Sequence, residues 1–148
     1  MCESLVDLNS QVPDLLNACV EGQPALSTME DHQWYKTEFV PSVVGRGLDV
    51  SKKWGRSSAP STAIAIADAI RALVVPTAPG DCFSTAVCSD GNPYGVQEGL
   101  IFSFPCRSTG NGSYEICDGF VLDDWLASRI TASQEELEKE KSSIMHLL

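Results

Sequence analysis

The segment STAIAIADAIRALVV, residues 61–75, constrains the fold more than any other part of the chain. It carries alanine, isoleucine, leucine or valine at most positions, and only Asp68 and Arg71 are charged. Serines at 57 and 58, a proline at 60 and another at 76 are typical start and stop signals, so we expect one helix that ends near residue 75. Because a helix that is apolar on nearly every side is stable only when it is covered, we expect other elements to enclose it.

A second helical pattern lies just before this segment. Apolar residues recur at helical spacing over residues 31–53, and Asp31 is a suitable N-cap. Pro41 and the triplet Gly45-Arg46-Gly47 interrupt the pattern. A proline inside a helix removes one hydrogen bond and clashes with the preceding turn, so we expect a bent or two-part helix.

The second half of the chain contains strand patterns. Residues 82–88, 100–107 and 113–117 read as strands, and Asn111-Gly112 is a strong signal for a two-residue hairpin loop. Such a loop would place Cys106 opposite Cys117. A redox-active pair and two buried, reduced thiols are both open, and we prefer the second because opposed residues at a hydrogen-bonded position hold their side chains apart.

Shorter signals complete the pattern. Residues 15–20 followed by Glu21-Gly22 predict a small hairpin or strand-turn-strand. Asp123-Asp124 starts a helical stretch, and residues 133–136 form a capping box with Ser133 at the N-cap of an amphipathic terminal helix. We therefore expect one α+β domain in which antiparallel strands pack on long helices.

Charge and cysteine spacing exclude several function classes. The formal net charge is -10, which repels phosphate backbones and anionic membrane surfaces, so we expect neither nucleic acid nor a membrane as a partner. The six cysteines form no C-x-x-C pair, and the two histidines, His32 and His146, lie far apart in the sequence. We therefore expect no metal site, and both histidines are expected at the surface.

Several longer strings of residues resemble the lactate/malate dehydrogenase family, most closely the chloroplast NADP-dependent malate dehydrogenases. The resemblance runs from about Gln11 to Leu147, which predicts a divergent segment at residues 1–10 and a C-terminal dehydrogenase domain at residues 11–148. The strings that carry it are Lys53-Trp54-Gly55-Arg56-Ser57-Ser58-Ala59, Ile66-Ala67-Asp68-Ala69-Ile70, Phe83-Ser84-Thr85, Gly91-Asn92-Pro93-Tyr94-Gly95 and Phe104-Pro105-Cys106-Arg107-Ser108.

The resemblance implies the substrate-binding and dimerisation part of an enzyme that interconverts malate and oxaloacetate with NADP. In that family a histidine exchanges a proton with the substrate while the cofactor carries hydride. Here the position of that histidine is held by Asp7, and Gly45-Arg46-Gly47 lacks the third glycine of a dinucleotide fingerprint. We therefore expect no catalytic residue in this chain, no cofactor bound by this chain alone, and no activity in isolation.

Ser57 and Ser58 are the candidate substrate-binding residues. The resemblance places this segment against the substrate, and hydroxyls at the start of a helix join the backbone N–H groups and dipole end that favour an anion. The alternative is that both serines only cap the helix. The two roles are compatible.

Partners and location follow from the resemblance as well. We expect a homo-oligomer or association with a full-length subunit, because the isolated domain should expose apolar surface that is normally covered. A catalytically inactive interaction protein that joins intact subunits is one alternative, and a self-sufficient enzyme with altered chemistry is another. The family suggests the chloroplast stroma. The acidic start MCESLVDLNS is no transit peptide, so the chain would be cytoplasmic if Met1 is the true start.

Overall fold

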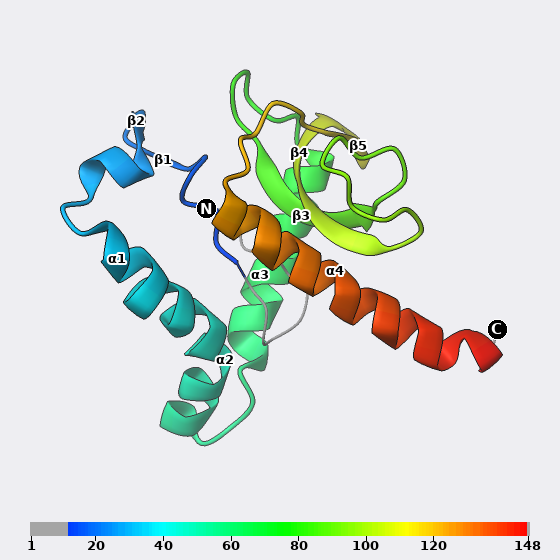
Figure 1. The fold of residues 1–148 in the computed structure, drawn as a ribbon, viewed down its shortest axis with the longest axis horizontal. Coiled ribbons are helices and arrows are strands. Elements are labelled where there is room, and N and C mark those ends of the chain that lie inside the picture. Colours follow the sequence, from blue (N-terminus) through cyan, green and yellow to red (C-terminus); the bar gives the residue numbers. More distant parts are fainter. Residues whose placement is uncertain (1–11, 148) are drawn as a thin grey trace.

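The computed structural model of the chain describes residues 12–147, and Figure 1 shows how its helices and strands are arranged. Three antiparallel strands form one sheet in the order β3-β4-β5, and a separate two-stranded hairpin, β1-β2, lies near the start. This is the α+β arrangement that the sequence predicts. The elements in chain order are β1 (Cys19–Val20), β2 (Gln23–Pro24), η1 (Ala25–Thr28), α1 (His32–Trp34), η2 (Tyr35–Phe39), α2 (Val40–Trp54), α3 (Ala59–Val74), β3 (Phe83–Cys88), β4 (Ile101–Gly110), β5 (Ser113–Ile116), α4 (Asp124–Ile144) and η3 (Met145–Leu147).

The helix expected after residue 31 forms, but the expected division into two parts is not seen: α1, η2 and α2 follow one another directly, with right-handed helical backbone at both junctions. Asp31 is its N-cap, and the side chain accepts a hydrogen bond of 2.8 Å from the Gln33 N–H. Within this run the helix widens into the π-helical turn η2, where the Val40 N–H donates to the Tyr35 carbonyl. It lies just before Pro41, which has no N–H to continue the ordinary pattern. The glycine triplet at residues 45–47 does not interrupt α2.

The apolar helix α3 forms as predicted, but the expectation that other elements enclose it is wrong for this chain. None of its residues is buried, and Ile64, Ile66 and Ile70 are 65%, 55% and 55% exposed. Only its C-terminal end is anchored, because Leu73 O accepts hydrogen bonds from Ser108 Oγ at 2.6 Å and from Gly112 N–H at 3.1 Å. The rest of the helix extends away from the sheet (Figure 1). Its apolar sides therefore face solvent.

The predicted hairpin loop between β4 and β5 is confirmed. Asn111 and Gly112 both have positive φ, 58° and 81°, as a two-residue primed turn requires. A β-bulge lies directly beside the loop, between Ser108 and Gly110. Ser108 Oγ accepts from the Gly110 N–H at 2.9 Å, which stabilises the bulge, while its hydroxyl hydrogen is donated to the Leu73 carbonyl.

The bulge corrects the predicted register. One extra residue in β4 shifts the pairing, so Cys106 lies opposite Ile116 rather than Cys117. The Cys117 N–H donates instead to the Pro105 carbonyl, at 2.8 Å. Both cysteines are buried, and neither takes part in a disulfide among residues 12–147. The reading as buried thiols therefore fits the structure better than a cross-strand pair.

The terminal helical stretch starts at Asp123-Asp124 as predicted, but the predicted second start at Ser133 is not seen. α4 begins after Asp123, whose side chain accepts from the Leu126 N–H at 2.7 Å, and it continues without a break to residue 144. Ser133 is a buried residue inside this helix, so the predicted capping box is wrong. The helix had already started at the Asp123 cap. Further along, the Gln134 side chain accepts from the Gln97 N–H at 2.9 Å, which holds this part of α4 against the loop before β4.

The main core lies between the sheet and α4. Buried side chains of β3, β4 and the connecting loop, among them Phe102 and Phe104, pack with Ile130 and Leu137 of α4. A second cluster surrounds Tyr35, which stacks edge-on against Trp125 at 5.2 Å between ring centroids. The Tyr35 hydroxyl donates to the Pro13 carbonyl at 2.7 Å and fixes the start of the described chain. His32 and His146 are at the surface, as expected.

Stability should fall at high pH because of Tyr35. Burial, and secondly the charge of Asp14, raise the pKa of Tyr35 from 10.0 to about 12. The folded state therefore favours the protonated phenol, and this contribution is present below pH 10.0 and lost as the pH rises toward about 12. Urea unfolding across this range should show a steeper loss for the natural chain than for Tyr35→Phe. The control Tyr114→Phe, at an exposed tyrosine of β5, should keep the steep loss.

The exposed face of α3 should make the chain self-associate. Replacing Ile66 by Glu and Ile70 by Lys removes two apolar side chains and creates a favourable i,i+4 pair, so the helix should persist. Sedimentation velocity should show concentration-dependent association for the natural chain and a shift toward monomer for this double variant. The control Ile101→Glu changes an exposed isoleucine on β4, 61% accessible, and should leave the association unchanged. A natural chain that stays monomeric at all concentrations would contradict the prediction.

Candidate functional site

The turn between α2 and α3 carries the two predicted substrate-binding serines. Gly55 ends α2 in the left-handed conformation with φ 69°, and its N–H donates to the Ser51 carbonyl at 2.9 Å. Glycine meets this conformation without the strain that a side chain would add. The chain then reverses direction, so Ser57 and Ser58 lie at the start of α3, at the end of the helix farthest from the β4–β5 hairpin (Figure 1).

Ser57 caps α3, because its Oγ accepts a hydrogen bond of 3.3 Å from the Ala59 N–H. Ser58 occupies the N-cap position, but its side chain makes no capping hydrogen bond. Its carbonyl instead accepts from the N–H groups of Ser61 and Thr62, at 3.0 and 3.3 Å. Capping by a side chain is therefore confirmed for Ser57 and wrong for Ser58.

These hydrogen bonds limit how the turn could hold an anion. Pro60 has no N–H, and the other backbone donors of the first turn of α3 are already engaged. The hydroxyl hydrogens of Ser57 and Ser58 and the positive end of the helix dipole remain available to an anion. The position that resembles the family's histidine, Asp7, lies outside the described residues, so the structure does not place an acid or base beside the serines.

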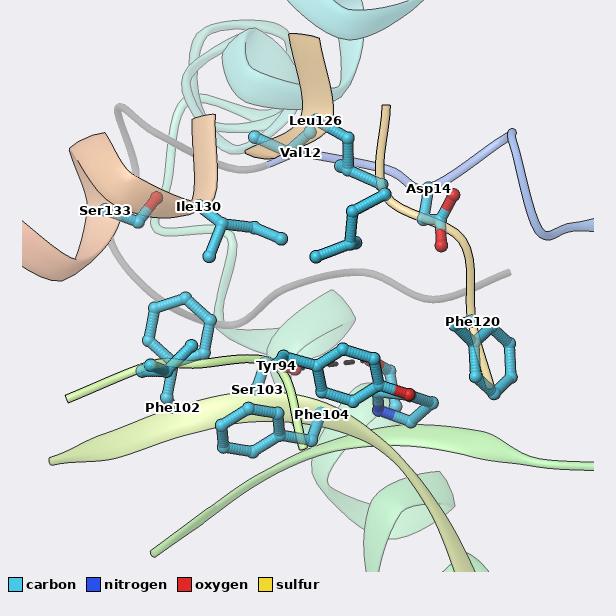
Figure 2. Close-up of a pocket in the computed structure, with 14 residues that line it drawn as sticks. Val12, Asp14, Tyr94, Phe102, Ser103, Phe104, Phe120, Leu126, Ile130 and Ser133 are labelled. Carbon is cyan, nitrogen blue, oxygen red and sulfur yellow. Dashed lines mark hydrogen bonds between the residues drawn. The ribbon is translucent and has the colours of Figure 1, made fainter. Parts of the chain in front are cut away.

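A cavity of about 100 Å³ lies between the sheet and the N-terminal half of α4. Figure 2 shows Phe102 and Ser133 at one end, Asp14 and Phe120 at the other, and the aromatic rings of Tyr94 and Phe104 along the side formed by the sheet. The lining is mostly apolar and comes from five separate parts of the chain. It comprises Val12, Asp14, Ser84, Tyr94, Val96, Phe102, Ser103, Phe104, Pro105, Phe120, Leu122, Leu126, Ile130 and Ser133.

The tyrosine in this lining is not placed for proton transfer near neutral pH. Its hydroxyl donates to the Cys117 carbonyl at 2.5 Å. Burial raises the pKa of Tyr94, and the neighbouring Cys117 and Asp118 raise it further. The phenol therefore stays protonated and engaged. The described residues of the lining include no histidine, and their mostly apolar side chains are suited to holding a ligand.

The sequence analysis did not identify this cavity. Its lining residues are apolar positions that any strand or helix of the core would carry, and only the packing of α4 on the sheet brings them around one space. One local signal was available at its edge. Asp14 and Asn17 form a short loop in which the Asp14 carboxylate accepts from Asn17 N–H at 3.1 Å and from Asn17 Nδ2 at 2.7 Å.

Across residues 12–147, no group of three or more histidine, cysteine, aspartate or glutamate side chains is arranged to hold a metal ion. Within this range there is also no helix long and apolar enough to cross a bilayer.

Comparison with known proteins assigns the chain to a family. Residues 9–148 match the model of the lactate/malate dehydrogenase alpha/beta C-terminal domain. The chloroplastic NADP malate dehydrogenase of Mesembryanthemum crystallinum is 52% identical over 138 residues, which cover 93% of this chain and 31% of that protein. A malate dehydrogenase of Protochlamydia amoebophila is 43% identical over 94% of the chain and 42% of its own length. The chain thus spans less than half of these relatives.

Solved structures show the same relationship. The malate dehydrogenase from Naegleria fowleri superposes with a TM-score of 0.84 at 35% identity, covering 95% of this chain and 42% of that one. A Trichomonas vaginalis lactate dehydrogenase, in complex with NADH and oxamate, superposes with a TM-score of 0.86 at 28% identity, covering 98% of this chain and 45% of that one. The expected fold is confirmed, and the chain belongs to the lactate/malate dehydrogenase family, of which it is the alpha/beta C-terminal domain.

Proposed function

We propose that this chain is the substrate-side domain of a plastid malate dehydrogenase that uses NADP to interconvert malate and oxaloacetate. The observation that carries the proposal is the 52% identity over 138 residues to a chloroplastic NADP malate dehydrogenase. The chain spans only 31% of that relative. The activity of the complete enzyme is therefore itself part of the proposal.

We further propose that these 148 residues do not catalyse the reaction by themselves. Hydride transfer requires a bound dinucleotide and an imidazole that exchanges a proton with the substrate oxygen. The sequence contains no complete glycine fingerprint, and Asp7 stands at the place that resembles the family's histidine. A carboxyl group with an ordinary pKa of about 3.9 is a poor replacement for imidazole near neutral pH.

The role proposed for Ser57 and Ser58 is recognition of a substrate carboxylate. Both hydroxyls lie at the start of α3, where the helix dipole favours a negative charge. Since the backbone donors of this turn are already engaged, the two hydroxyl groups would have to donate the hydrogen bonds to the carboxylate. Ser58 is the stronger candidate because its side chain is not used for capping.

The proposed partner is a complete dehydrogenase subunit or a second copy of this chain. Support comes from α3, on which Ile64, Ile66 and Ile70 are each more than half exposed. Apolar surface of this kind marks a site for another protein surface. The same observation supports the second candidate function, a non-catalytic protein that associates with intact subunits and alters their activity.

Turnover by the purified chain is the direct test of its expected inactivity. NADPH absorbance should not fall above background when the chain is mixed with NADPH and oxaloacetate, because the nucleotide site and the imidazole are not encoded in it. A full-length malate dehydrogenase assayed in parallel serves as the positive control. Oxidation of NADPH that rises in proportion to the concentration of the purified chain would refute the proposal.

Association can be tested separately from catalysis. A tagged chain co-expressed with a full-length plastid malate dehydrogenase should retain that subunit on an affinity column. The Ile66→Glu, Ile70→Lys variant should retain it poorly, because the proposed contact surface has become charged, while Ile101→Glu should behave like the natural chain. Equal retention by all three forms would show that the α3 face is not the contact surface.

A further inference from the structure

We propose that the cavity between the sheet and α4 is a binding site for a small apolar ammonium ion, such as a short branched alkylamine, with the carboxylate of Asp14 as its counter-charge. This site is separate from the serine turn and does not depend on the proposed dehydrogenase role. Three properties of the lining support the assignment: its apolar walls, its internally paired polar groups and its single carboxylate.

The walls suit an aliphatic group. Phe102, Phe104 and Leu126 are buried and line the space together with Ile130 and Val96. The volume of about 100 Å³ is smaller than the engineered cavity of roughly 150 Å³ that accepts benzene. We therefore expect the site to take a branched alkyl group of about four or five carbons rather than a fused ring system.

The polar groups inside the cavity are already paired, which disfavours a polar ligand body. Ser84 Oγ and Ser103 Oγ lie 3.2 Å apart in a hydrogen bond with each other. The Tyr94 hydroxyl donates to the Cys117 carbonyl. A ligand hydroxyl or amide placed deep in the space would lose its hydrogen bonds to water without replacement, which weakens its binding.

Asp14 selects the charge of the ligand. Among the described residues that line the cavity, it is the one carboxylate, and none of them is a lysine, arginine or histidine. The two hydrogen bonds from Asn17 occupy two of about four acceptor positions on its oxygens, so the carboxylate can accept further donors. The net charge of -10 adds a field that attracts cations and repels anions.

The arrangement in Figure 2 gives the ligand an orientation. Asp14 lies at the end of the cavity near Phe120, and the apolar side chains of Ile130 and Phe102 lie toward the other end. The alkyl group would lie between the sheet and α4. The ammonium group would remain beside Asp14, which is only partly buried, and would keep part of its hydration.

Three ligands with the same alkyl group test the proposal: 3-methylbutylamine, 3-methylbutan-1-ol and 3-methylbutanoate. Each is titrated into the natural chain and followed by methyl NMR. The expected result is that the amine binds about fivefold or more tightly than the alcohol, that the carboxylate does not bind, and that the shifts centre on Val12, Leu126 and Ile130. Added salt should weaken the binding of the amine but not that of the alcohol.

Two variants distinguish the contribution of the Asp14 charge to binding from the contribution of the apolar cavity. Asp14→Asn should reduce the affinity for the amine to that for the alcohol, whereas the control Asp49→Asn, at an exposed aspartate of α2, should not change it. Ile130→Phe should fill the space and abolish the binding of both ligands. Equal binding of amine and alcohol to the natural chain, amine binding without salt dependence, or shifts that lie outside the cavity lining would each overturn the proposal. The absence of any binding would overturn it as well.

Discussion

The packing of α4 on one face of the β3-β4-β5 sheet is the contact on which the rest of this domain depends. Phe104, only 2% exposed, and Phe102 meet Ile130 and Leu137 across this interface. Apolar burial of this kind is the main stabilising contribution in a domain of this size. The same contact leaves a small apolar space near the start of α4, so the proposed ligand site is a consequence of how the core is built.

The second important feature is α3, a helix in which no residue is buried. α3 is bonded to the β4–β5 hairpin through Leu73, while its isoleucines remain exposed. The chain matches a C-terminal domain and spans less than half of its relatives. Among residues 12–147, no element buries these isoleucines.

Signals carried by a few neighbouring residues predicted most of the elements. They failed where another feature of the structure set the register or the helix start. The N-cap at Asp31 and the Asn111-Gly112 loop depend on a few adjacent residues, and both were predicted correctly. The predicted register of Cys106 was wrong because of the bulge beside the hairpin loop, where the Ser108 side chain accepts a hydrogen bond from the Gly110 N–H. The capping box at Ser133 was wrong because the helix had already begun at Asp123.

By itself, the sequence determined the α+β class, the family and the place of the serine turn, because periodicity, caps and matching strings are local properties of the chain. Only the tertiary structure decided that α3 stays exposed, that Cys106 and Cys117 are not opposed and that Asp14 borders an apolar cavity. The physical reason is that these features require residues far apart in sequence to meet, and which of them meet is settled by how α4, the sheet and the first described residues pack together.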